Sequence, residues 1–194
     1  MLFEWFQNDL YSGTLIGFIM SIIFMIAIYF IALRPKQLSW NAVGVNPFHQ
    51  RYWGPIVGWT IALVVGSIGL LIVMSLLGVG SENSKTESIR TQMTVMHICI
   101  AWVSAGVISP IYEEILYRGF LYRWFRSKYG VRTGMIISSF IFMIVHIPTY
   151  NVMPVTFISG LLFAWTYERT KSVFPSMIIH SAFNTIALIA TVIG

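Results

Sequence analysis

Two adjacent glutamates and an arginine stand at the end of a long apolar stretch, in the segment SPIYEEILYRGF that begins at Ser109. Residues four apart share one face of a helix, so Glu114 and Arg118 are expected to form an ion pair. Glu113 points about 100° away from its neighbour and lacks that partner. A desolvated carboxylate of this kind can act as a general base. The alternative is an ordinary salt bridge that ends a transmembrane helix.

Pro110 lies just before this pair of glutamates. Proline has no N–H, so it removes one hydrogen bond of the helix and frees the carbonyl group of Gly106. This favours a kink and a polar opening beside the glutamates.

Two later segments contribute histidines. Phe142 and His146 are four residues apart in SSFIFMIVHIP, where the phenyl ring can pack beside the imidazole and fix its rotamer. His180 and Asn184 are four apart in FPSMIIHSAFNTIAL and place an imidazole and an amide on one face. Two side-chain donors at one height can stabilise an oxyanion. Taken singly, either segment could instead supply only polar contacts between membrane helices.

The three segments together indicate more than each does alone. Ionisable groups within a membrane are costly unless they are paired, and few other polar groups are available to pair with them. We therefore expect one buried cluster that can hold and deprotonate a water molecule. Glu113 would take the proton, His146 would orient or share it, and His180 with Asn184 would bind the developing oxyanion. This is the chemistry of peptide-bond hydrolysis.

The composition indicates which elements must position these residues. Hydrophobic residues make up 57% of the 194 residues and charged residues 10%, against about 25% charged in a soluble domain. Several apolar stretches have the 18 or more residues that cross a bilayer core of about 30 Å. The sequence predicts an all-α polytopic transmembrane helical bundle, with residues 1–194 forming a single integral membrane domain. About six spans are expected: Thr14–Leu33, Gly54–Val79, Met93–Tyr112, Gly134–Ile147, Met153–Tyr167 and Val173–Ile193.

The net charge of +5 could suggest nucleic-acid binding, but the positions of the basic residues argue against it. Ten of the twelve lie in alternate loops, as the positive-inside rule requires of cytoplasmic loops, and only Lys85 and Arg90 lie on the other side. Both termini are then extracytoplasmic. The segment LYRGFLYRWFRSKYGVRTG, residues 116–134, is expected to form an interfacial cytoplasmic helix with its basic groups near lipid phosphates.

The motifs EEILYR, FMIVH and HSAFN follow one another in this order between Pro110 and Asn184. They resemble the motifs of the CPBP family of intramembrane proteases, also called Abi-type, which includes CAAX prenyl endopeptidases and proteins of bacteriocin processing or self-immunity. The motif-bearing core would span about residues 93–193. The resemblance implies a helical-bundle protease whose active site opens to the cytoplasmic side. It implies Glu113 and His146 as the water-activating pair and His180 and Asn184 as oxyanion binders, with Glu114, Arg118 and Phe142 as supporting residues.

The cofactor requirement is open at this stage. Glu113, His146 and His180 with a water molecule could form a zinc site. The chain has no H-E-x-x-H motif, in which one helix arranges two ligands and a base. We therefore favour a metal-free Glu/His mechanism and keep Zn²⁺ as the alternative.

The expected partners are the lipid bilayer and a membrane-associated or hydrophobic peptide or protein substrate, and the compact chain indicates a bacterial plasma membrane. Two other functions compete with proteolysis. One is a non-catalytic membrane immunity or partner protein, in which the polar cluster serves only packing. The other is a small proton or ion transporter, which the absence of a matching repeat disfavours.

Overall fold

The computed structural model describes residues 9–78, 94–147 and 149–193, and every regular element in these ranges is a helix. The predicted all-α fold class is confirmed. The main helices are α2 (Asp9–Ala27), α3 (Trp53–Leu76), α5 (Val95–Ala101), α6 (Ser109–Glu114), α7 (Arg123–Ile144), α8 (Met153–Thr170) and α9 (Phe174–Ile193). Three π-helical segments continue these helices: η1 (Ile28–Leu33), η5 (Trp102–Ile108) and η6 (Ile115–Tyr122). Short 3₁₀ turns are η2 (Arg34–Lys36), η3 (Trp40–Val43), η4 (Gln50–Tyr52) and η7 (Tyr150–Val152).

Four helical stretches of the described chain are long and apolar enough to cross a membrane: Tyr11–Lys36, Gln50–Leu76, Val95–Ile144 and Phe174–Ile193. Their outer faces carry exposed apolar side chains such as Val65 and Leu76, as lipid-facing helices do. The first predicted span lies within one of them, and the second, third and last overlap the others. The polar loop with Lys85 and Arg90, and the predicted span ends Val79 and Met93, lie outside the described residues.

The expected fourth and fifth spans correspond to parts of α7 and α8. The fourth, Gly134–Ile147, begins after the break at Gly130, where φ is 81° and ψ is 174°, although the apolar stretch Val95–Ile144 runs across this break. The fifth corresponds to α8, which is not among the four apolar stretches. Helix α8 packs largely against other helices, so its buried face can carry polar residues: Thr156, Ser159 and Thr166. These residues lower its mean hydropathy.

The expected interfacial helix over residues 116–134 is wrong in its first half. Tyr117, Arg118 and Tyr122 are at most 5% exposed and lie in the core. Tyr117 packs edge-on against Phe142 and Arg118 lies against Phe142 and Phe163, while Gly119 lets η3 approach on another side: a Cβ at this position would overlap the carbonyl oxygen of Val43. Only the second half, from Arg123 onward, is largely exposed.

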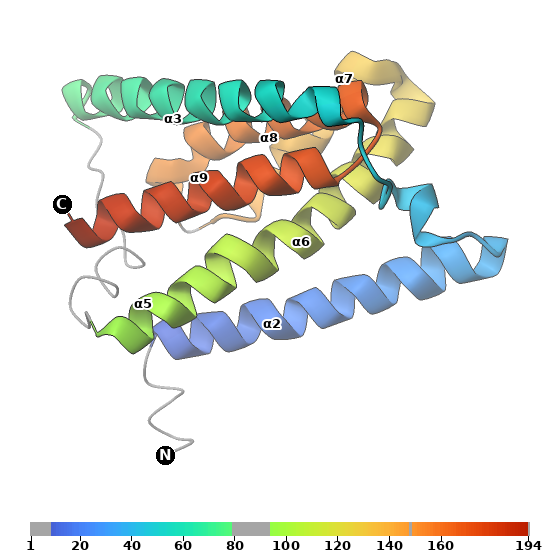
Figure 1. Cartoon of the computed structure of the whole chain (residues 1–194), viewed down its shortest axis with the longest axis horizontal. Helices are drawn as coiled ribbons and strands as arrows, with labels where there is room; N and C mark the ends of the chain where they lie inside the picture. The colour runs from blue at the N-terminus through green and yellow to red at the C-terminus, as the bar shows by residue number, and fades with distance from the viewer. Residues whose placement is uncertain (1–8, 79–93, 148, 194) are drawn as a thin grey trace.

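Helix α9 has a central position. It packs against α3 and α8 on one side and against η5 and α6 on the other, while α2 packs against α6 and η5 away from α3 (Figure 1). Helices α8 and α9 are joined by three residues, with Lys171 in the left-handed conformation at φ 55°. The connection is held by the segment before α3, because the Val173 N–H donates to the Gly44 carbonyl at 2.9 Å.

Candidate active site

The glutamate pair and the last helix meet in a buried ionic cluster. Arg118 Nη1 donates to Glu114 Oε1 at 2.8 Å, which confirms the predicted ion pair within one helix. The same carboxylate oxygen lies 3.0 Å from His180 Nδ1, on α9. Arg118 also donates to the carbonyl of Gly160 on α8 at 3.4 Å. Glu114 is therefore the group that joins η6 to α9, and its side chain is 0% exposed.

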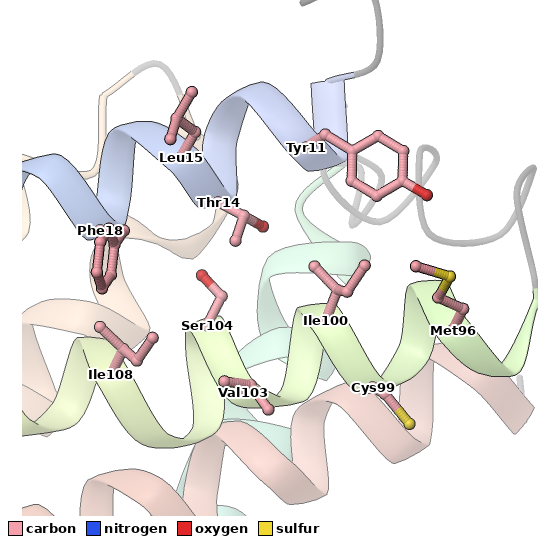
Figure 2. Close-up of a pocket in the computed structure, with 10 residues that line it drawn as sticks. All are labelled: Tyr11, Thr14, Leu15, Phe18, Met96, Cys99, Ile100, Val103, Ser104 and Ile108. Atoms are coloured by element: carbon pink, nitrogen blue, oxygen red, sulfur yellow. The ribbon is translucent and has the colours of Figure 1, made fainter. Parts of the chain in front are cut away.

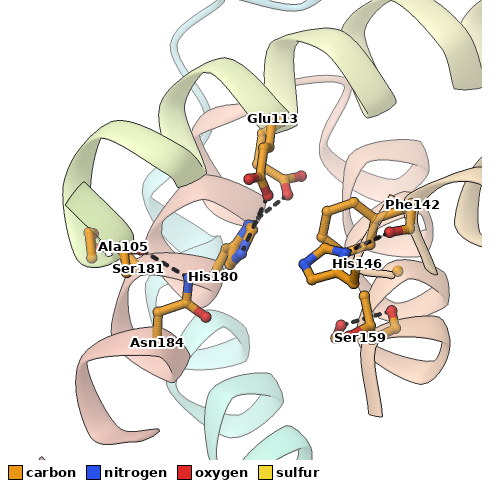
Figure 3. Close-up of polar contacts among 12 residues, drawn as sticks. Ala105, Glu113, Phe142, His146, Ser159, His180, Ser181 and Asn184 are labelled. Carbon is orange, nitrogen blue, oxygen red and sulfur yellow. Dashed lines mark hydrogen bonds and ion pairs between the residues drawn. The ribbon is translucent and has the colours of Figure 1, made fainter. Parts of the chain in front are cut away.

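Glu113 faces the other nitrogen of the same histidine. Its Oε2 lies 3.8 Å from His180 Nε2, and its side chain is 14% exposed (Figure 3). This distance is too long for a direct hydrogen bond, but one water molecule about 2.8 Å from each atom can bridge the two.

Two phenyl rings pack against the Arg118 and His180 side chains of this cluster. The Arg118 guanidinium carbon lies 4.4 Å from the ring centre of Phe142 and 5.0 Å from that of Phe163. Phe163 stacks on His180, with ring centres 4.7 Å apart and planes 23° apart. Phe142, expected as a supporting residue, meets His180 edge-on at 5.8 Å. Phe163 was not among the predicted residues, and no spacing rule indicates it, because it comes from α8 and reaches the site only through packing.

His146 lies just beyond the end of α7. Its Nδ1 donates to the Phe142 carbonyl at 2.8 Å, since a carbonyl oxygen can only accept. Its ring packs edge-on against Phe142 with centres 5.0 Å apart, as expected from the i, i+4 spacing. In Figure 3 the imidazole points toward the side on which Glu113 and His180 lie. Both histidines therefore contact one phenyl ring from different helices.

The carbonyl groups of η5 are bonded by side chains of α9. The Ser181 hydroxyl donates to the Gly106 carbonyl, the group that Pro110 was expected to free. Asn184 Nδ2 donates to the Ala105 carbonyl at 2.8 Å (Figure 3). Asn184 thus lies one turn along α9 from His180 and uses one of its two amide hydrogens for helix packing. Its predicted role as an oxyanion donor stays a prediction.

The zinc alternative can be compared with this geometry. Among the residues that the structure describes, no three His, Cys, Asp or Glu side chains are grouped so that they could hold a metal ion. Glu113, His146 and His180 therefore do not form a ready ligand set in this arrangement. The Nδ1 atoms of both histidines are held by Glu114 and by the Phe142 carbonyl, which is how metal-binding histidines are commonly oriented. The metal-free mechanism, with Zn²⁺ as the alternative, stays a prediction.

Two cavities flank α5 and α6. One, of about 430 Å³, lies between α2 and the α5–η5 stretch and is mostly apolar, with Cys99 on its wall (Figure 2). The other, of about 380 Å³, lies between η5–α6 and α9 and is lined by Pro110, Ile111, Met177 and Ser181 among others. Neither cavity is lined by Glu113, His146 or His180.

Glu168, to which the sequence assigned no role, ties the end of α8 to the start of α7. Its carboxylate accepts two hydrogen bonds from Arg126, at 2.8 and 2.9 Å, and one from Tyr122 at 2.8 Å. Lys171 Nζ lies 2.6 Å away. Partial burial raises the pKa of Glu168, but the hydrogen bonds from Arg126, Lys171 and Tyr122 outweigh it and hold the pKa at about 2.

The model of the type II CAAX prenyl endopeptidase Rce1-like family matches residues 95–186. YdiL of Bacillus subtilis, whose name marks it as a proposed membrane peptidase, is 28% identical over 173 residues, which are 88% of this chain and 69% of YdiL. The UPF0177 proteins YbdI and YxdF of Lactococcus lactis are 26% and 24% identical, over 71% and 82% of this chain and 73% and 87% of their own lengths. No solved structure matches the chain significantly.

Proposed function

Since the resemblance to this membrane protease family is confirmed over residues 95–186, we propose that the protein is an intramembrane endopeptidase in which Glu113 activates a water molecule. The single observation that carries this mechanism is the position of Glu113 Oε2, 3.8 Å from His180 Nε2, in a cluster whose other charges are paired. The proposed substrate is a membrane-associated or hydrophobic peptide. The proposed location is the bacterial plasma membrane, with the site open to the cytoplasmic side.

The geometry favours an assignment of catalytic roles to Glu113 and the histidines that differs from the assignment implied by the family resemblance. His180 holds its Nδ1 proton toward Glu114, so its Nε2 is directed toward Glu113 and can accept a hydrogen bond from the bridging water. The water oxygen attacks the carbonyl carbon of the substrate while Glu113 takes its proton. When the C–N bond breaks, Glu113 returns this proton to the leaving amine.

His146 would stabilise the oxyanion in this scheme. Its Nδ1–H is already directed to the Phe142 carbonyl, so only its Nε2 can serve the substrate. In the imidazolium form, Nε2–H donates to the oxyanion and adds a positive charge where negative charge develops. Asn184 can add its second amide hydrogen, as the motif implies.

The test is hydrolysis of a library of membrane-embedded reporter peptides by the purified protein, with Glu113→Gln as the inactive variant. The variant keeps the size of the side chain and removes its basicity, so it should cleave at least about 100-fold more slowly. Glu168→Gln is the matched control, because it makes the same chemical change away from the site and should retain cleavage. A parallel arm with a chelator decides whether a metal takes part. Equal cleavage by wild type and Glu113→Gln would contradict the proposed mechanism.

A non-catalytic partner protein remains the second candidate, on one specific observation. Glu114 Oε1 bonds both Arg118 and His180, as a group that serves only helix packing would. Packing alone, however, gives no reason for a second carboxylate on the same histidine. Cleavage of no library member by the wild type, together with unchanged stability of Glu113→Gln, is the result expected of this candidate.

A further inference from the structure

Two arginines that are far apart in the sequence meet at one tyrosine. Arg51 Nη2 donates to the Tyr52 hydroxyl at 3.3 Å, and this hydroxyl donates to the Arg169 carbonyl, at the end of α8, at 2.9 Å. The backbone N–H of Arg51 donates to His49 Nδ1 at 3.1 Å, which holds the backbone of η4. The segment before α3 and the end of α8 therefore place two arginines beside each other.

Aromatic rings hold both guanidinium groups. The guanidinium carbon of Arg51 lies 5.0 Å from the ring centre of Tyr52. That of Arg169 lies 5.3 Å from the ring centre of Trp165. Both rings pack against Trp59 of α3, with ring centres 6.5 Å and 5.0 Å apart. A guanidinium held on a ring face still presents N–H groups at its edge, so both arginines can bind an anion.

The charges of these two arginines are not balanced within the part of the chain that the structure describes. No carboxylate there lies within ion-pair distance of either one. The neighbouring Glu168 is paired instead with Arg126 and Lys171. Arg51 and Arg169 are both exposed, so an anion from outside the chain can reach them.

An apolar face of α3 continues from this charged end. Trp53, Val57 and Ile61 are 53%, 58% and 58% exposed, and their spacing of four places them on one side of the helix. Arg51 and Arg169 also belong to the basic residues that are expected on the cytoplasmic side, where anionic lipids attract such groups. A free phosphate ion would match only the two arginines, whereas a phospholipid matches the arginines and the apolar face.

We propose that the two arginines and this apolar face form a binding site for one anionic phospholipid of the cytoplasmic leaflet. The lipid phosphate accepts hydrogen bonds from the guanidinium groups of Arg51 and Arg169, and an acyl chain lies along the apolar face of α3. A bound lipid then holds the start of α3 to the end of α8. This inference does not depend on the proposed function.

The test is native mass spectrometry of the full chain in detergent, titrated with dioleoyl phosphatidylglycerol. Arg51→Gln with Arg169→Gln should lower the affinity at least about tenfold, because each basic group near an anionic headgroup contributes about fivefold. Lys36→Gln with Arg132→Gln is the matched control, since it removes two exposed positive charges that are expected on the same side. This control should lower the affinity less than about threefold, because distant exposed charges are screened. Equal losses in both pairs would show attraction by surface charge alone and would overturn the site.

Two further measurements identify the ligand. Dioleoyl phosphatidylcholine has the same chains and no net charge, so it should bind more weakly, and equally to wild type and to Arg51→Gln with Arg169→Gln. Inorganic phosphate should leave the phosphatidylglycerol bound, and its displacement would assign the arginines to free phosphate and overturn the lipid site. If the double variant unfolds, the single variants Arg169→Gln and Arg132→Gln give the same comparison, with an expected loss of about fivefold for Arg169→Gln alone.

Discussion

Glu113 and Glu114 are neighbours in the chain, yet their side chains make different contacts. Glu114 is bonded to Arg118 and His180 and is fully buried, so its charge stabilises the junction of η6 and α9. Glu113 has 14% of its side chain exposed, and its Oε2 lies 3.8 Å from His180 Nε2. Loss of the two charges should therefore affect different properties, one stability and the other activity.

At Glu114, we expect Glu114→Gln to lower the free energy of unfolding by about 3 kcal/mol, because it leaves the Arg118 guanidinium buried without its counter-ion. Chemical unfolding in detergent micelles measures this loss. The double variant Glu114→Gln with Arg118→Met should recover part of the stability, since no charge is then left unpaired at that position. A loss below about 1 kcal/mol for the single variant would show that Glu114 does not carry the junction.

Sequence reasoning found contacts within one helix better than contacts between helices. The Glu114–Arg118 ion pair and the Phe142–His146 contact both follow from the i, i+4 spacing and are present. The contact of Glu114 with His180 and the stacking of Phe163 join separate helices, and their partners depend on how α8 and α9 pack. Spacing along the chain carries no information about that packing.

At the scale of elements, a group of polar contacts joins the end of α8 to the start of the α7 region. Glu168 at the end of α8 accepts hydrogen bonds from Tyr122 and Arg126 at the start of the α7 region. The sequence indicated the long apolar helices correctly but mistook the boundaries around residues 112–134. Burial of η6 depends on contacts with α7, α8 and the η3 backbone, and hydropathy along the chain cannot show such contacts between elements.

The Glu168 junction predicts a pH dependence of stability. The pKa of this carboxyl is held at about 2 in the folded protein, below its ordinary value of 4.5. Its contribution is therefore complete above pH 4.5 and is lost as the pH falls from 4.5 toward 2. We expect the difference in unfolding midpoint between wild type and Glu168→Gln to shrink over this window. A difference that stays constant from pH 6 to about 2 would contradict this assignment.

At the scale of the whole molecule, basic residues gather at one end of the bundle. The end of α2, the beginnings of α3 and α9 and the α7 region lie together there (Figure 1). Direct contacts join them, since Tyr52 bonds the Arg169 carbonyl and Arg126 bonds Glu168. Among the described residues at this end, Glu168 is the acidic residue that offsets the basic ones. Such an end is expected to face the cytoplasm.

This orientation predicts one-sided chemical labelling. In a Cys99→Ser background, a cysteine in place of Lys36 or Lys171 should react with a membrane-impermeant maleimide in inverted vesicles and not in intact spheroplasts. Both positions are exposed, so the reagent can reach them from the correct side. Labelling from the outside would reverse the predicted topology and place the basic end in the extracytoplasmic space.

The hydrogen bonds between α9 and η5 fix the position of His180 along the helix axes of the bundle. Ser181 and Asn184 bond consecutive backbone carbonyls, and Trp102 bonds Thr185 at 3.1 Å. A shift of α9 by one helical turn, about 5.4 Å, would break all three contacts at once. His180 is therefore held at one level of the bundle. In the proposed mechanism, a substrate must bring its scissile bond to that level, so the distance of the bond from the membrane surface would select substrates.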